Sequence, residues 1–160
     1  MHEYGMVCMR YNRDGLNSSI KVWNPFLNKV RDIQDPSNRL ARQTISAYAF
    51  GYTPNTDDYA IVHVFKRHIR DRQCLCHVYS SSTMEWSYRY VIAEHFKNLG
   101  SNSMMYKRNA LWVNWVGRQF IRANDIVMFD VDQYKLQKTK IKREDREHFQ
   151  CLAICGDQVW

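Results

Sequence analysis

One seven-residue segment, Tyr59–Phe65, is apolar on both sides of an extended chain, and it limits the possible folds more than any other stretch. In a strand, Tyr59, Ile61 and Phe65 would point to one side, while an alanine and two valines would point to the other. A strand with two apolar faces lies between two layers of structure and not at a surface. The segment therefore predicts a layered β protein in which Tyr59–Phe65 is an interior strand.

A second apolar run, Ala47–Tyr52, precedes this strand across a turn. The connecting sequence, TPNTDD, is rich in turn formers, because proline fixes its own φ and Asn and Asp side chains bond to nearby backbone. The two runs therefore predict a pair of strands joined by a turn. Gly51 lies inside the first strand, where glycine marks either a bulge or a close approach of another backbone.

Three segments resemble one another and indicate a weak internal repeat. Each has an apolar residue, then an aromatic residue, then Asn, Ser or Asp: IKVWNPFLNKV, CHVYSSSTMEW and IVMFDVDQYKL. The aromatic residues are Trp23, Tyr79 and Phe129, and a large apolar residue follows seven positions after each. They recur about every 50 residues, which suits one four-stranded propeller blade per repeat. We expect the three aromatic side chains to occupy equivalent, largely buried sites.

The apolar segments can be arranged as strands of successive blades. This arrangement predicts an all-β, antiparallel fold: an incomplete β-propeller, an open arc of blade-like four-stranded repeats whose first and last blades lack strands. The predicted strands are Tyr4–Tyr11, Ser19–Asn24, Lys29–Ile33, Ile45–Tyr52, Tyr59–Phe65, Cys74–Ser80, Glu85–Val91, Ser103–Lys107, Ala110–Val116, Asp125–Phe129, Lys135–Ile141, Phe149–Cys155 and Gln158–Trp160.

The sequence also carries a family resemblance. FGYTPNTDDYAIVHVF, at Phe50–Phe65, resembles the FGYxPxTxDYxVV signature of the F-box associated domain of plant F-box proteins. Further landmarks of that family follow in the right order and cover most of the chain. They are GMVCM from Gly5, VWNP from Val22, HVYSSSTMEW from His77, NALWVNW from Asn109 and IVMFDV from Ile126.

The resemblance implies a kelch-like propeller domain that selects targets for a cullin-based ubiquitin ligase. In the family this domain follows an N-terminal F-box, and no F-box is present in these 160 residues. We expect residues 1–160 to form one partial domain, an incomplete recognition module that cannot assemble a ligase alone. Its partner would be a target protein or a glycan, and the ligase adaptor would bind only if an F-box were supplied.

The net charge of +7 leaves a basic nucleic-acid-binding β domain as the alternative function. The charges are not massed in one block, however, so we favour a solvated basic surface and expect no nucleic acid partner. Lys138, Lys140 and Lys142 alternate along one predicted strand. They could follow a phosphate backbone, but we favour an outermost strand that lysines protect from edge pairing.

The composition also indicates in which cellular compartment the protein is expected. No apolar run approaches the roughly 18 residues of a membrane span, and the N-terminal sequence does not resemble a signal peptide. Five cysteines form an odd set without disulfide-rich spacing, which favours reduced thiols. We therefore expect a protein of the cytoplasm or nucleus that has no contact with a membrane.

Enzyme signatures are missing from the sequence. It contains no glycine-rich phosphate loop, nucleophile elbow, HExxH helix or EF-hand loop. We expect no catalytic activity and no cofactor.

One group of residues could act as metal ligands. If the strands 59–65 and 74–80 pair symmetrically, His63 faces Cys76 and shares one side of the sheet with Cys74 and Cys76. Three soft ligands could begin a zinc site, but C-x-C on a strand is not the usual spacing and no fourth ligand is indicated. We expect Cys74 and Cys76 to be buried thiols without metal.

Binding residues are expected on loops, where a rigid sheet presents variable sequence. The segment Lys66–Arg72 is basic and could bind a carboxylate or phosphate through arginine forks, or it could simply be solvated. The other candidate loops are Asn12–Asn17, His95–Ser103 and Gly117–Asn124. The candidate ligand-facing residues are Arg67, His68, Arg70, Arg72, Arg118 and Gln119.

Overall fold

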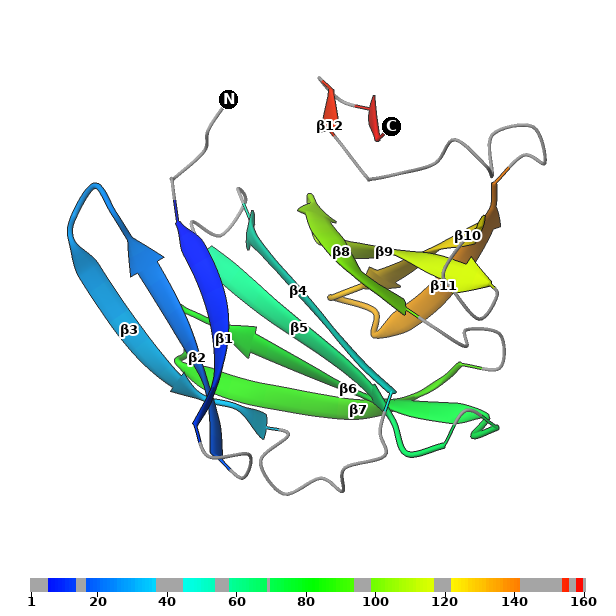
Figure 1. Cartoon of the computed structure of the whole chain (residues 1–160), viewed down its shortest axis with the longest axis horizontal. Helices are drawn as coiled ribbons and strands as arrows, with labels where there is room; N and C mark the ends of the chain where they lie inside the picture. Colours follow the sequence, from blue (N-terminus) through cyan, green and yellow to red (C-terminus); the bar gives the residue numbers. More distant parts are fainter. Residues whose placement is uncertain are drawn as a thin grey trace. The chain divides into compact units, whose positions relative to one another are not determined.

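The computed structural model describes residues 6–13, 17–36, 45–53, 58–68, 70–93, 99–116, 122–141, 154–155 and 158–159. Apart from a 3-10 conformation at Pro36, the regular secondary structure in these ranges is β-strand, drawn in chain order in Figure 1. The strands are β1 (Val7–Arg13), β2 (Asn17–Asn24), β3 (Lys29–Gln34), β4 (Ile45–Thr53), β5 (Asp58–Lys66), β6 (Gln73–Ser80), β7 (Glu85–Ile92), β8 (Leu99–Tyr106), β9 (Asn109–Val116), β10 (Arg122–Asp130), β11 (Lys135–Lys140), β12 (Ile154–Cys155) and β13 (Gln158–Val159).

The chain divides into two compact units, Met1–Arg42 and Gln43–Trp160. The first unit contains one antiparallel sheet of order β1-β2-β3. Its buried apolar residues, Ile20, Val22 and Ile33, alternate along β2 and β3, as expected for a sheet with one covered face. Asp35, just after β3, is also buried and accepts hydrogen bonds of 2.7 Å each from Arg10 Nε and Ser18 Oγ. These bonds fasten the end of β3 to the other two strands.

The second unit contains two four-stranded antiparallel sheets and a short hairpin. The sheet orders are β4-β5-β6-β7 and β11-β10-β9-β8, so each sheet is a simple meander, and β12 pairs with β13. The first strands of the two sheets, β4 and β8, lie against each other (Figure 1). In β5, seven consecutive residues from Ala60 to Lys66 are buried, which confirms the prediction of an interior strand with two covered faces.

One face of the β4–β7 sheet packs against the β8–β11 sheet. Alternate small residues of β5, with Cys74 and Cys76 of β6, form a single core with residues of β8, β9 and β10. The largest contributors, Trp112 and Phe129, are each 0% exposed. The indole Nε1–H of Trp112 donates a 3.0 Å hydrogen bond to the backbone oxygen of Tyr48, which ties β9 to β4. The core therefore combines apolar burial with a directional bond between the sheets.

Gly51 lies where β4 passes close to β8. A Cβ at this position would come within 2.1 Å of Met105 Cβ, closer than two such atoms can approach. The pairing of β4 with β5 continues through Gly51 without a register shift. Of the two roles that the sequence left open, the structure therefore supports close approach and not a bulge.

The internal repeat appears in the structure as a repeated turn. The aromatic residue and the apolar residue seven positions later are cross-strand partners in all three segments. The last residue of each four-residue turn has a positive φ: 49° for Asn28, 59° for Met84 and 51° for Tyr134. The repeat is thus confirmed at the level of pairing register and backbone conformation. The cross-strand pairs are Trp23 with Val30, Tyr79 with Trp86, and Phe129 with Leu136.

Burial of the repeated aromatic residues is uneven. Tyr79 and Phe129 are buried, as expected, but Trp23 is only half-buried. The expectation of a largely buried site is therefore wrong for Trp23. Its cross-strand partner Val30 is 57% exposed, so this face of β2 and β3 does not enclose the indole.

Asp58, the first residue of β5, holds the β6–β7 turn in place. Its buried carboxylate accepts hydrogen bonds from the hydroxyl groups of Ser80, Ser81 and Ser82 and from the Ser82 backbone N–H. Burial on its own would raise the pKa of Asp58, but these hydrogen bonds outweigh it and hold the pKa below its usual value. The charged form is therefore the one that stabilises the turn.

Replacing Asp58 with alanine should lower the free energy of unfolding at pH 7 by about 3 kcal/mol, because several hydrogen bonds to a buried charge are lost. The lowered pKa means that this stabilisation is complete above the unfolded-state value of about 3.9 and is lost as pH falls through the folded-state value. Urea titrations of wild type and D58A between neutral and acidic pH should therefore converge at the acidic end. An equal difference at every pH would contradict the assignment, and D58N provides the uncharged control of similar shape.

The predicted fold class is confirmed: the chain is all-β, with antiparallel sheets of three or four strands that form blade-like units. The described strands make no closed ring of complete blades, because one sheet has three strands and the β12–β13 pair has two. The strand β11 lies at the edge of its sheet, with Lys138 and Lys140 exposed. This position agrees with the edge-protection interpretation, whereas Lys142 lies outside the described residues.

Candidate functional site

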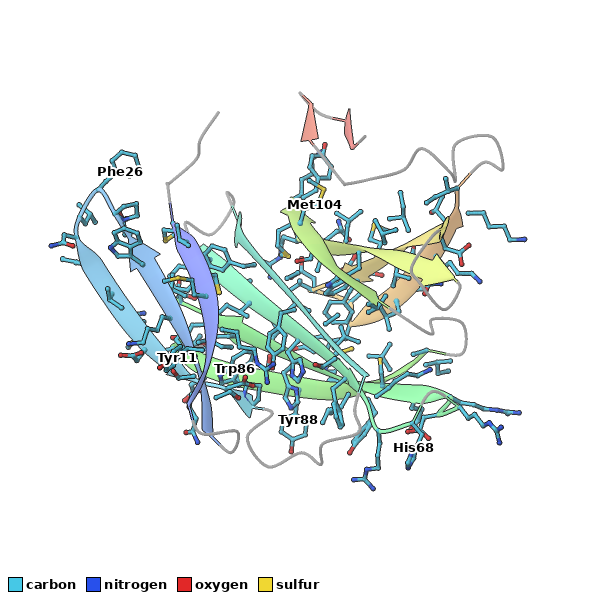
Figure 2. The ribbon with its side chains drawn as sticks, in the orientation of Figure 1. Tyr11, Phe26, His68, Trp86, Tyr88 and Met104 are labelled. Atoms are coloured by element: carbon cyan, nitrogen blue, oxygen red, sulfur yellow. The ribbon has the colours of Figure 1, made fainter. Side chains whose placement is uncertain are left out.

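The turn between β5 and β6 presents the first group of candidate residues. Arg67, His68, Arg70 and Arg72 are all exposed there (Figure 2 labels His68). The turn is closed by a 2.9 Å hydrogen bond from the His68 backbone N–H to the Asp71 carboxylate and a 3.1 Å bond from the Asp71 N–H to the His68 oxygen. Asp71 is thus engaged with the turn backbone. Hereafter we call Arg67–Arg72 the basic turn.

The base of the basic turn is fastened to the segment that follows β7. The buried Lys66 ammonium donates a 2.7 Å hydrogen bond to the backbone oxygen of Ala93, and the Ala93 N–H donates one of 2.7 Å to the Arg72 oxygen. Burial lowers the pKa of Lys66, although the neighbouring Cys74 and Asp71 favour its charged form. The predicted loop Lys66–Arg72 therefore begins with an anchoring residue and not with a ligand-facing one.

The guanidinium groups of the basic turn are available for an incoming anion. Among the residues that the structure describes, no carboxylate forms an ion pair with Arg67, Arg70 or Arg72. An arginine fork of this kind suits a carboxylate or phosphate that approaches from solvent. The two other candidates, Arg118 and Gln119, lie outside the described residues, so the structure does not test whether they join this site.

The other three predicted loops are shorter in the structure than the sequence indicated. The strand β8 begins at Leu99 and β10 begins at Arg122, inside the segments His95–Ser103 and Gly117–Asn124 that were expected to be loops. At the third loop, Arg13 belongs to β1 and Asn17 to β2. Backbone pairing therefore extends further into these connections than their polar sequences indicated.

The predicted grouping of His63 with Cys74 and Cys76 is wrong. In the structure His63 pairs with His77, and Cys76 pairs with Val64, so the register differs by one residue from symmetric pairing. A shift of one residue moves a side chain to the opposite face of a sheet. The two cysteines therefore lie in the core between the sheets, while His63 lies on the other face. Among the described residues, no three His, Cys, Asp or Glu side chains are placed to hold a metal ion.

The thiols of Cys8 and Cys76 are not activated as nucleophiles. Cys74 and Cys76 are buried, unbridged and 3.5 Å apart at their sulfurs. The hydrogen bond that the Cys76 thiol shares with Cys74 and the burial of the site both raise the pKa of Cys76. Burial also raises the pKa of Cys8 to about 11. Because a thiolate is the reactive form, these pKa shifts favour inert, structural cysteines.

The second face of the β4–β7 sheet carries a row of rings that the sequence did not reveal. Tyr48, His63, His77 and Tyr88 are consecutive cross-strand partners on four adjacent strands. Their ring centroids are 4.2 Å, 5.3 Å and 6.2 Å apart in that order. The first ring, Tyr48, is half-buried and the two histidines are buried, whereas Tyr88 is exposed and points away from β7 in Figure 2. The alternating aromatic residues in WSYRY of β7 were the available signal.

Antiparallel sheets of three or four strands, joined in simple chain order, define a protein built of propeller-like blades. The chain matches the F-box associated beta propeller domain over residues 3–152, and it belongs to that family. No F-box domain is detected in the 160 residues. A comparison with curated proteins finds no significant match.

Membership of this family indicates the general role of such domains. Domains of this family are typically substrate-binding modules of F-box proteins, and they are not known to be catalytic. They bind substrate proteins or glycans for F-box ligases. Within the described parts of the chain, no helix is long and apolar enough to cross a bilayer.

Proposed function

We propose that this chain selects target proteins for a cullin-based ubiquitin ligase, as the recognition module of an F-box subunit. The family match over residues 3–152 carries the proposal. The basic turn supports it, because a rigid four-stranded sheet holds three exposed arginines at one end without a described carboxylate partner. A target with exposed carboxylates could bind there without first breaking an ion pair.

Under this proposal residues 1–160 act as one recognition domain, to which both compact units contribute. Its partner is a target protein, with a glycan as the alternative ligand. The ligase adaptor binds through an F-box joined to the domain and not through the domain itself. The module works in the cytoplasm or nucleus and requires no cofactor.

A paired pull-down with the small adaptor subunit of the ligase tests whether the adaptor binds the F-box and not this domain. The chain alone should not retain the adaptor, whereas the same chain fused behind a generic F-box should retain it. The adaptor-binding surface belongs to the F-box, so the F-box alone should bind the adaptor as well as the fusion does. Direct retention of the adaptor by the unfused chain would contradict the proposal.

A further inference from the structure

The outer strand of the β4–β7 sheet exposes three large apolar side chains in a line. Tyr88, Tyr90 and Ile92 are 67%, 69% and 70% exposed, and they occupy alternate positions on one face of β7. The opposite face of β7 is already used for packing. The Ser87 hydroxyl is hydrogen-bonded to the Tyr134 hydroxyl, and the Arg89 guanidinium lies 4.8 Å from the centre of the Tyr134 ring. The exposed line is therefore a separate surface of this strand, which we call the β7 stripe.

The β7 stripe leads directly to the basic turn. Tyr90 pairs with Leu75 and Ile92 pairs with Gln73, the first residue of β6 after the turn. Ala93, the next residue of the chain, is hydrogen-bonded to Arg72 through its backbone. Figure 2 shows Tyr88 on β7 and His68 at the turn. The apolar side chains of β7 thus adjoin the basic turn, whose guanidinium groups form no ion pair with a described carboxylate.

The edge strand of the other sheet is built differently. At the positions of β11 that correspond to Tyr88 and Tyr90 lie Lys138 and Lys140, both exposed. Charged residues on an edge strand discourage association with another chain, while a line of exposed apolar residues indicates a binding surface. The edge strands β7 and β11 therefore differ in the property that decides whether a partner can dock.

We propose that the β7 stripe and the basic turn together bind an extended, acidic segment of the target protein. Its alternate apolar side chains would pack on Tyr88, Tyr90 and Ile92, and carboxylates beyond them would reach Arg70 and Arg72. The charge balance identifies the partner: the turn holds three arginines, and its one carboxylate, Asp71, is engaged with the turn backbone. This inference rests on the proposed function, since it names the class of target that the domain selects.

The spacing of the stripe favours a peptide over a nucleic acid. Alternate residues of a strand lie about 6.6 Å apart, which is also the spacing of same-side residues in an extended peptide. Single-stranded nucleic acids instead bind through successive aromatic platforms, and Ile92 offers no ring for a base. The stripe therefore fits apolar peptide side chains better than stacked bases.

Selection of random phage-displayed peptides on the full chain tests the proposal. The enriched peptides should combine apolar residues at alternate positions with a cluster of Asp or Glu. A labelled synthetic copy of the most enriched peptide should bind about tenfold or more weakly to Y88S/Y90S and to R70E/R72E. Both substitution pairs are at exposed sites, and unchanged urea midpoints would verify that the variants remain folded.

Matched controls come from the same chain. K135E/K140E makes an equal change of charge on β11, and F26S/L27S removes two exposed apolar residues from the β2–β3 turn. Both control variants should bind the peptide as the wild type does. The proposal is overturned if selection enriches no acidic peptide, or if the stripe and turn variants bind as tightly as the controls. It is equally overturned if labelled oligothymidylate binds this surface and the selected peptides do not.

The ligase activity of the fusion separates this inference from the proposed function. If the F-box fusion carrying Y88S/Y90S or R70E/R72E still captures and ubiquitinates its target like the wild-type fusion, the β7 stripe is not the binding surface and the proposed function stands. If the wild-type fusion itself captures nothing, the proposed function fails.

Discussion

Replacing Trp112 with alanine is expected to lower the free energy of unfolding of this protein by about 3–5 kcal/mol, the range found for buried aromatic residues. The indole is completely buried in the core between the two sheets of the second unit. Its Nε1–H also bonds to the Tyr48 oxygen, so the substitution removes both packing and a link between β9 and β4. Such a loss is comparable to the whole stability of a small domain.

Urea unfolding followed by far-ultraviolet circular dichroism measures the effect of W112A. Tyr88→Ala serves as the control, because this ring is largely exposed and its removal should change the stability by about 0.5 kcal/mol or less. A loss below about 1 kcal/mol for W112A would show that Trp112 does not join the sheets as the structure indicates.

Replacing Gly51 with alanine should cost about 3 kcal/mol, at the upper end of the usual range for overpacked sites. The new Cβ would lie 2.1 Å from Met105 Cβ and 2.5 Å from its Cγ. Because Met105 Cβ is bonded directly to the backbone, rotation of the side chain cannot remove the contact. The strands β4 and β8 would have to separate, which would disturb the packing between the sheets.

A second substitution tests the cause of that loss. The double variant G51A/M105G removes the opposing Cβ, so its instability should be smaller than the sum of the two single effects. S46A, an exposed position on the same strand, should be nearly neutral. Additive losses in the double variant would mean that contact with Met105 is not the reason that glycine is required.

The sequence contained enough information to predict the strands and the repeat. Tyr59–Phe65 could be placed inside the protein because both of its faces are apolar, and the structure extends this strand by only one residue at each end. The seven-residue spacing after Trp23, Tyr79 and Phe129 reflects one turn geometry in three places. Patterns of this kind are local, so a single sequence reveals them.

The register between β5 and β6 could not be predicted in the same way. Symmetric pairing would place His63 opposite Cys76, but the basic turn is closed by Asp71 and His68, and the strands pair His63 with His77. Turn geometry sets the register of adjacent strands, and one residue of difference exchanges the two faces. This difference of one residue in register places His63 on the opposite face of the sheet from Cys74 and Cys76, so the three do not form a zinc site.

The candidate site was predicted in part. The basic residues of the turn were identified from their charge and their position between two strands, and the structure shows all four exposed. The β7 stripe was missed, because Tyr88 and Tyr90 in a strand are equally compatible with burial. The position of β7 as the last strand of its blade was predicted, but only the three-dimensional arrangement shows that nothing described covers these rings.

Ubiquitin transfer by a reconstituted ligase is the most direct test of the central claim that this chain is a target-recognition module. The chain is fused behind a generic F-box, assembled with adaptor, cullin and the ubiquitin-charging enzymes, and supplied with a cell extract. We expect ubiquitin conjugates on a small, reproducible set of proteins that the F-box alone does not modify and that excess unfused chain suppresses. The same conjugates with the F-box alone, or none with the fusion, would contradict the claim.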